Sequence, residues 1–506
     1  MERIYRIFFF PMYICAIPLF ILYFVSIQEL PHVLSIGKVV FLFIAFASFY
    51  FFLLGYIIFQ YCYTCIKEDI VCIFILSFVG YFLFMNGPFL MPPSDPLFHL
   101  NYMWQGTYNL KYLFIAKQKL NSIFFYLLFW IRNPDSFFSA FELVQMYHLC
   151  IVYYLICSAY FASRVINLPP FWSVLSVLIM LLFFGTNRFS YVSYYSLTPS
   201  AINMGLYWLF SALLFSSLWR VKEFVWRDLK IMINITILIV LLTPIVYNSH
   251  AQESGFLFFT LLFTFYILLY KVRNFELSLS MQLLVSIIFL STTAVLFFPY
   301  LKIFHSIVNV YRLIQASGFL NNYGTHWLLL DWKVPRIWDT LGIFGVFPWM
   351  LVIFYPLSHF LLQKRHFLYR NLKLSLCLSL VPIWMLLVPF NLFVWASSIT
   401  NIAHVLWRAT YSSQFWISIS FFLYFLSKTI VPRLCRSISY KQLEYLILIL
   451  SFCFFYLISE IRSSPFWGKK DFIILETYNY YKDITRLIST RLPYSRNRMY
   501  WSDPIT

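Results

Sequence analysis

The sequence predicts an all-α membrane protein, a polytopic bundle of about thirteen transmembrane helices. Hydrophobic residues make up 61% of the chain and charged residues only 11%, whereas soluble globular chains are roughly 45–50% apolar and about 25% charged. The mean hydropathy is +0.77. A water-soluble fold could not bury this much apolar surface, so we expect lipid to cover part of it.

Apolar runs of roughly 17–25 residues are long enough to cross the hydrocarbon core as helices. The first run follows a basic flank, is too long for a typical cleaved signal and has no small-x-small cleavage site after it, so it predicts a permanent helix. The shorter apolar stretch 122–131 predicts an interfacial or re-entrant segment. The expected spans lie near residues 7–27, 37–63, 70–86, 146–163, 170–186, 201–218, 231–247, 255–270, 281–299, 341–362, 374–392, 412–427 and 444–459.

The side-chain sizes predict how the helices pack. The chain holds 60 Phe and 38 Tyr but only 13 Gly. Small residues let transmembrane helices approach each other closely. We therefore expect a bulky-sided, loosely crossed bundle with clefts open to lipid.

Lys and Arg in the short loops predict the orientation, because cytoplasmic loops are enriched in them. With the N-terminus cytoplasmic, eighteen basic residues, Arg164 among them, fall on inside segments, and the short outside loops carry only Lys38, Arg188 and Arg408. The chain then forms a transmembrane domain over 1–459, with large extracytoplasmic loops near 87–145 and 300–340. The tail 460–506 lies on the same outer side.

A polar motif opens the first of these large loops. Asp95 and His99 stand four residues apart in Asp-Pro-Leu-Phe-His, directly after the third expected span. A helix beginning at Pro96 would place Asp95 at its N-cap and His99 one turn later. A capping Asp and an interfacial His are the structural alternative. Glu29, in the first short outer loop, is a rival for a catalytic carboxylate.

This motif resembles the first-loop Asp-Pro-x-x-His pattern of the GT-C superfamily of polyprenol-dependent glycosyltransferases. The expected helix number, the cytoplasmic N-terminus and the large early outer loop resemble that superfamily as well. The resemblance implies that Asp95 acts as a general base, or as a metal or acceptor contact, with His99 beside it. Two features depart from the family: its motif usually follows the first helix, and this tail lacks the Trp-Trp-Asp-Tyr-Gly signature of oligosaccharyltransferases.

In size, topology and composition the chain is similar to the bacterial and phage O-antigen glucosyltransferases that change serotype. That similarity implies a multi-pass protein of the bacterial inner membrane with its C-terminus in the periplasm. It also implies transfer of a sugar, with glucose expected, from an undecaprenyl-phosphate donor to lipid-linked O-antigen or a related glycan. A donor-sugar synthase and a flippase would be functional partners, and metal dependence stays open. An O-antigen polymerase is the alternative, and a lipid or solute transporter is a third.

Basic residues on the outer side are candidates for holding the donor phosphate. A departing phosphate gains negative charge in the transition state, and the planar guanidinium of Arg binds phosphate bidentately. The candidates are Arg312, Lys333, Arg336 and Arg408. Arg408 stands out because a charge this close to hydrocarbon is costly unless it is paired or faces a polar cavity. Snorkelling toward headgroups is the alternative for Arg408, and solvated surface charge for the others.

Aromatic and acidic residues alternate in the second large loop, as in a groove for a sugar acceptor. Ligand sites combine apolar walls with a few well-placed polar groups, although interfacial aromatic belts have the same composition. The candidate acceptor residues are Trp327, Asp331, Trp332 and Asp339.

Several function classes are disfavoured. The nine cysteines are scattered through apolar runs, which argues against a disulfide framework. Cys62-Tyr-Thr-Cys65 has the spacing of a redox or zinc pair but lacks a companion, so we expect ordinary helix-end cysteines and assign no metal ligands. The net charge of +18 serves topology and headgroup contacts rather than nucleic acid. We expect no helix to carry the buried acidic and basic residues of an ion-coupled transporter.

Overall fold

The fold is known for a defined part of the chain. The computed structural model describes residues 2–24, 32–84, 119–132, 137–183, 200–220, 226–249 and 413–429, with isolated residues or short runs within 99–107, 192–198, 257–264, 368–379 and 442–453. Every regular element among these residues is helical. The all-α prediction is therefore confirmed for this part of the chain.

Two of the described connections between helices are short helical turns of irregular type. A π-helical turn, Tyr5–Phe9, joins the first two, and a π-helical turn with a 3₁₀ turn, Ile58–Cys62 and Tyr63–Cys65, joins the third and fourth. Their bounds are α1 Glu2–Ile4, α2 Phe10–Phe24, α3 His32–Ile57, α4 Ile66–Phe84, α7 Lys119–Arg132, α8 Phe137–Val165, α9 Pro170–Phe183, α11 Ser200–Arg220, α12 Trp226–Ser249 and α21 Phe415–Thr429.

Eight of the expected spans coincide with these helices, and the spans expected at 281–299 and 341–362 lie outside the described residues. The short stretch expected at 122–131 is the short helix α7, most of which is buried. The largest difference in bounds is at α8, which begins at Phe137. Backbone hydrogen bonding continues through polar residues such as Glu142 and Gln145, which an apolar window excludes.

Length and apolar surface together make this an integral membrane protein. Three described helical stretches are long and apolar enough to cross a membrane, Ile36–Phe84, Glu142–Val165 and Ser200–Leu218, and five shorter ones are apolar. On α4, the outward side chains Ile70, Phe74, Phe78 and Phe82 are 60–72% exposed. Such a continuous apolar stripe is unfavourable in water and natural in lipid.

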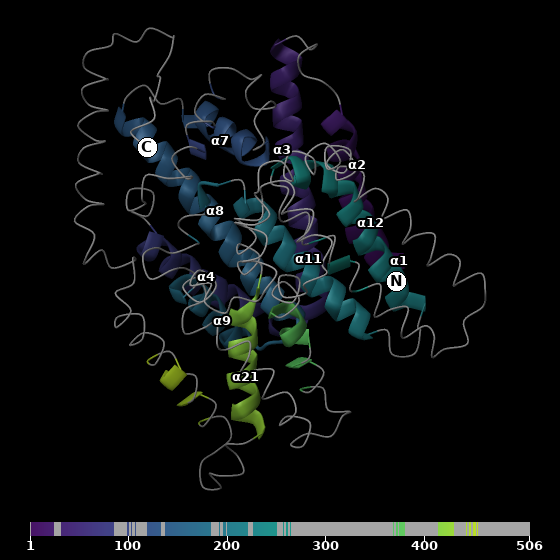
Figure 1. Cartoon of the computed structure of the whole chain (residues 1–506), viewed down its shortest axis with the longest axis vertical. Helices are drawn as coiled ribbons and strands as arrows, with labels where there is room; N and C mark the ends of the chain where they lie inside the picture. The colour runs from purple at the N-terminus through teal and green to yellow at the C-terminus, as the bar shows by residue number, and fades with distance from the viewer. Residues whose placement is uncertain are drawn as a thin grey trace, which may run out of the picture.

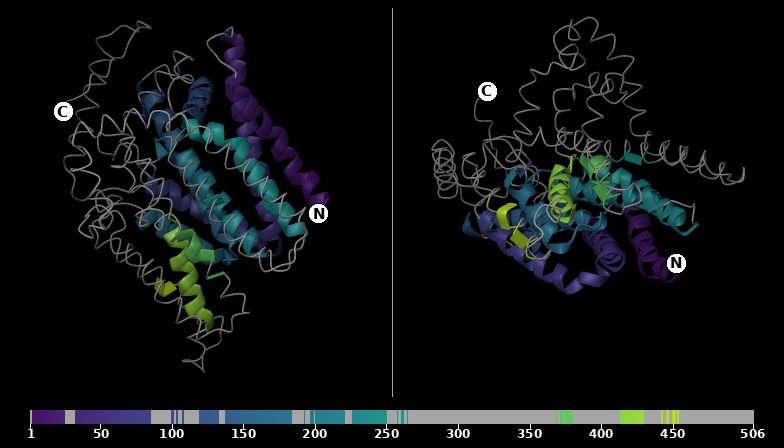
Figure 2. Two further views of the ribbon diagram at one scale, coloured as in Figure 1. Left: turned by 45° about the vertical axis from the view of Figure 1, so that its right-hand side comes forward. Right: turned by 90° about the horizontal axis from the view of Figure 1, so that it is seen from below.

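Helix α8 lies at the centre of the described bundle (Figure 1). It packs against α4, α7, α9 and α11, while α12 lies between α11 and α2, and α2 packs on α3. Figure 2 shows α12 running alongside α2, with α21 on the side of the bundle away from the N-terminus. Residues far apart in the sequence thus share one core.

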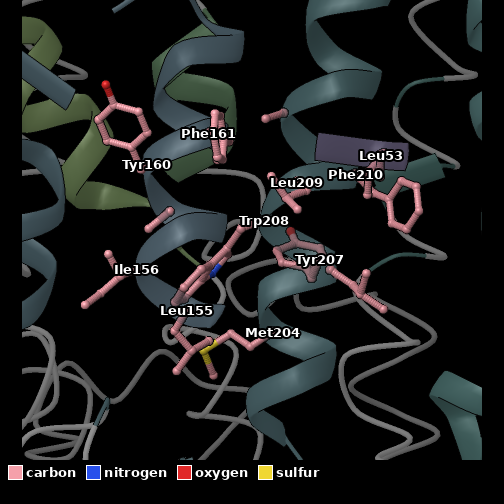
Figure 3. Packing of buried hydrophobic residues seen from close by; sticks show 14 of the residues in the cluster. Leu53, Leu155, Ile156, Tyr160, Phe161, Met204, Tyr207, Trp208, Leu209 and Phe210 are labelled. Carbon is pink, nitrogen blue, oxygen red and sulfur yellow. The ribbon is translucent and has the colours of Figure 1, made fainter. Parts of the chain in front are cut away.

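The contact between α8 and α11 is the largest in the core. Figure 3 shows Leu155 of α8 close to Met204 and Trp208 of α11, while Ile156 points to the other side of α8. The Trp208 ring also meets the Trp416 ring of α21 edge to face, with centroids 4.8 Å apart. Large aromatic side chains therefore fill the space between α11 and α21.

Two glycines nevertheless bring helices into close contact with α8. A Cβ atom on Gly80 of α4 would lie 2.6 Å from Ile156 Cδ1, and one on Gly205 of α11 would overlap the ring of Tyr154. The Tyr154 hydroxyl donates to the carbonyl oxygen of Ile202 at 2.7 Å, which fixes that ring. The expectation of a uniformly loose bundle is wrong at these two crossings, because a few well-placed glycines suffice for close approach.

Replacing Gly205 by Ala is expected to destabilise the protein by about 1–3 kcal/mol, because the tethered ring of Tyr154 must move. Thermal unfolding of the purified protein in detergent measures the effect. Gly37→Ala is the matched control in α3, where nothing lies within 4 Å of the new Cβ. Equal melting temperatures for the two variants would contradict the close crossing.

Candidate functional site

Helices α4 and α8 form an antiparallel pair with a polar centre at each end. At one end Asp69 of α4 contacts Arg164 of α8, and at the other the rings of Phe84 and His148 lie 6.2 Å apart. We call these the Arg164 end and the His148 end. The chain therefore leaves α4 and later enters α8 at the His148 end, as the alternation of the expected spans requires.

The Arg164 end holds a buried ion pair. Arg164 Nε lies 2.8 Å from Asp69 Oδ1, and a second guanidinium nitrogen donates a hydrogen bond to Oδ2 at 3.2 Å, so two nitrogens approach the carboxylate. The Tyr160 hydroxyl donates to Asp69 Oδ1 at 2.5 Å. Arg164 and Asp69 are only 5% and 3% exposed. The prediction that no helix carries buried acidic and basic residues is wrong. It therefore no longer argues against an ion-coupled transporter.

The same arginine connects the pair to the turn between α8 and α9. Its remaining guanidinium nitrogen donates to the carbonyl oxygen of Leu168 at 2.5 Å. Asn167, in the left-handed conformation with φ 63°, ends α8, and Leu168 N–H donates to the Ser163 carbonyl as in a Schellman cap. The Arg164 end is thus a junction of α4, α8 and α9. Arg164, expected as a loop charge that sets topology, is a buried structural residue.

The Cys62–Cys65 pair lies near this junction. Cys62 ends the π-helical turn and Cys65 the 3₁₀ turn, and both thiols are free. No group of three metal-ligating side chains occurs among the described residues. Cys62 and Cys65 thus lie in the helical turns between α3 and α4, the position expected for helix-end cysteines.

The His148 end gathers polar groups from three segments. His148 Nδ1 is within hydrogen-bond distance of Ser196 Oγ, and its Nε2 makes no hydrogen bond with the described residues. Two residues after Ser196, the Thr198 carbonyl oxygen accepts a hydrogen bond of 2.5 Å from Asn121 Nδ2 of α7. All these side chains are buried. Polar side chains therefore link α7, α8 and the segment before α11.

Tyr147 extends this group toward α7. Its ring packs against Phe124 and Phe125, at centroid distances of 5.7 and 5.4 Å. Its hydroxyl lies beside the Asn121 side chain, yet neither this hydroxyl nor Asn121 Oδ1 makes a hydrogen bond that the described residues supply. The same holds for Ser122 Oγ. We refer to Asn121, Ser122 and Tyr147 as the α7–α8 polar cluster.

Of the site residues expected from the sequence, the structure describes His99. His99 is half-buried in helical backbone, and Met103, one turn further, is fully buried in the core. The helix expected after Pro96 is thus present at His99. The remaining candidates lie outside the described residues: Glu29, Asp95, Arg312, Trp327, Asp331, Trp332, Lys333, Arg336, Asp339 and Arg408.

Helix directions show where the described helix ends that flank two of these candidates lie. The ring of Phe9, at the start of α2, lies 5.1 Å from that of Tyr56 near the end of α3, so α2 and α3 are antiparallel. Cys62, just after α3, lies beside Arg164. The ends of α2 and α3 that flank Glu29 are therefore at the His148 end, as is the end of α4 that precedes Asp95.

Sequence reasoning missed the polar residues of this end. Tyr147 and His148 lie inside an apolar run that was assigned only to membrane crossing, and Asn121 precedes the short apolar stretch. The available signal was His148, because a titratable residue within a span is unusual enough to indicate a polar environment.

Comparison with protein-family models, curated proteins and solved structures finds no match.

Proposed function

We propose that the chain is a membrane glycosyltransferase that moves a hexose from a polyprenyl-phosphate donor to a lipid-linked glycan. The observation that carries the proposal is the position of the Asp95-Pro-x-x-His99 motif. It directly follows the end of α4 that meets His148, and His99 lies in a helix that packs on the core. The described helix ends on either side of Glu29 in the sequence lie at this same end of the bundle, which supports a role for both carboxylates there.

The proposed chemistry is a displacement at the anomeric carbon of the donor. Asp95 takes the proton from an acceptor hydroxyl, whose oxygen forms a bond to this carbon. The bond between the anomeric carbon and the phosphate oxygen breaks, and polyprenyl phosphate leaves with the bonding electron pair. Arg408 and Arg336 would stabilise the charge of this leaving group. An apolar bundle in contact with lipid suits a donor whose prenyl chain stays in the membrane.

Radiolabelled undecaprenyl-phosphate glucose and lipid-linked glycan, given to the purified protein, test the proposal. We expect label to move to the glycan as a side branch. Extension of the glycan backbone would favour the polymerase instead. Movement of lipid or solute across vesicles without any transfer would favour the transporter.

The proposed mechanism also requires that the two large loops face the same side of the membrane. A single cysteine placed at position 95 and another at position 335 should both react with an impermeant thiol reagent from the extracytoplasmic side. Reaction of either one only from the cytoplasmic side would contradict the proposed site.

A further inference from the structure

The α7–α8 polar cluster holds three buried polar atoms that make no hydrogen bond with the described residues. They are Asn121 Oδ1, which can only accept, and the hydroxyls of Ser122 and Tyr147, which can donate and accept. Asn121 is held in this orientation because its Nδ2 donates to the Thr198 carbonyl oxygen. An alcohol hydroxyl both donates and accepts, so it matches the hydrogen-bonding capacity of all three atoms.

Burial makes this arrangement costly. Asn121, Ser122 and Tyr147 are at most 1% exposed, and buried polar atoms without partners are strongly unfavourable and rare in native proteins. Three such atoms on adjoining helices, Asn121 Oδ1, Ser122 Oγ and the Tyr147 hydroxyl, therefore indicate polar groups supplied by something other than the described side chains.

The surroundings favour a sugar. Phe124 and Phe125 pack on the Tyr147 ring, so hydroxyl-binding atoms are combined with aromatic walls, as in sites for small polar ligands with apolar faces. Tyr147 is the sixth residue of the span Glu142–Val165, about 8 Å from its start. The cluster also lies at the end of the bundle from which the motif segment emerges.

We propose that Asn121, Ser122 and Tyr147 form the subsite that binds the hydroxyl groups of the donor hexose. This inference rests on the proposed glycosyltransferase function. It assigns recognition of the sugar to α7 and α8, whereas the sequence motifs concern the base, the phosphate and the acceptor. Side chains in such a subsite lower the stability of the free protein and strengthen binding of the substrate.

The test uses two probe lipids, undecaprenyl-phosphate glucose and undecaprenyl phosphate without sugar. We expect wild-type protein to be stabilised more by the first lipid than by the second, as measured by thermal unfolding. In Tyr147→Phe, the melting temperature without lipid should be unchanged or higher, because an unbonded buried hydroxyl is removed. Its extra stabilisation by the sugar-bearing lipid should be lost, and KM for this donor should rise about tenfold. Ser122→Ala should change in the same direction.

Tyr154→Phe is the matched control on the same helix. The Tyr154 hydroxyl is bonded to the carbonyl oxygen of Ile202, so this variant should melt at a lower temperature and keep the wild-type KM. A lower melting temperature for Tyr147→Phe and Ser122→Ala with unchanged discrimination between the lipids would overturn the subsite and assign the cluster to structural water. If the wild-type protein transfers glucose, this outcome for the variants overturns the subsite and leaves the proposed function intact. Folded wild-type protein that neither distinguishes the lipids nor transfers any polyprenyl-phosphate hexose would overturn the proposed function itself.

Discussion

Replacing Arg164 by Met is expected to lower the free energy of unfolding by about 3–5 kcal/mol, enough to remove most folded protein from a detergent extract. The reason is the carboxylate of Asp69, which is 3% exposed and would lose both its hydrogen bond from Arg164 and its countercharge. Met fills a similar volume, so the expected loss comes from electrostatics and hydrogen bonds. Size-exclusion profiles and thermal unfolding of the variant measure it.

A double variant also removes the carboxylate charge that Arg164→Met leaves unpaired. In the double variant Asp69→Asn with Arg164→Met, the amide oxygen at position 69 can still accept from the Tyr160 hydroxyl. We expect this double variant to recover most of the lost stability, since replacing both partners of a buried pair costs far less than removing one. Lys67→Met is the control, because Lys67 is an exposed charge two residues away and should matter by less than about 0.5 kcal/mol. Equal losses for Lys67→Met and Arg164→Met would contradict a structural ion pair.

The helices were predictable because their signal is local. An apolar run long enough to cross lipid must satisfy its backbone within itself, so hydropathy alone locates α3, α8 and α11. The ion pair was not predictable in this way. Asp69 and Arg164 stand near the ends of apolar runs, where a charge usually faces water and sets topology. Only the antiparallel packing of α4 on α8 brings them together, and a contact across 95 positions of the chain leaves no local pattern.

Part of the candidate site was likewise predictable from the sequence, and part was not. The Asp95-Pro-x-x-His99 motif is a short pattern that sequence reasoning can find, and it includes a helix that the structure describes at His99. Tyr147 and Asn121 belong to no such motif. In an aromatic-rich span, a Tyr with a functional hydroxyl cannot be distinguished from one that only packs in the core. Their meeting depends on α7 folding back onto α8, which a short apolar stretch does not specify.

Asp95→Asn is expected to reduce transfer of the hexose by about 10²–10⁴-fold while the protein folds and inserts normally. The amide keeps the size and the capping ability of the carboxylate but cannot accept the proton of the acceptor hydroxyl. The rate of label transfer from undecaprenyl-phosphate glucose, with saturating acceptor, measures the loss, and the melting temperature checks the fold. Glu29→Gln is the matched control, since it neutralises the other carboxylate in a connection at the same end of the bundle, and it should lower the rate of transfer less than tenfold.

A large loss for Glu29→Gln with full activity of Asp95→Asn would move the base to Glu29, and the His148 end would remain the site. Full activity in both variants would leave the proposed mechanism without a base at this end, so another carboxylate would have to take the proton.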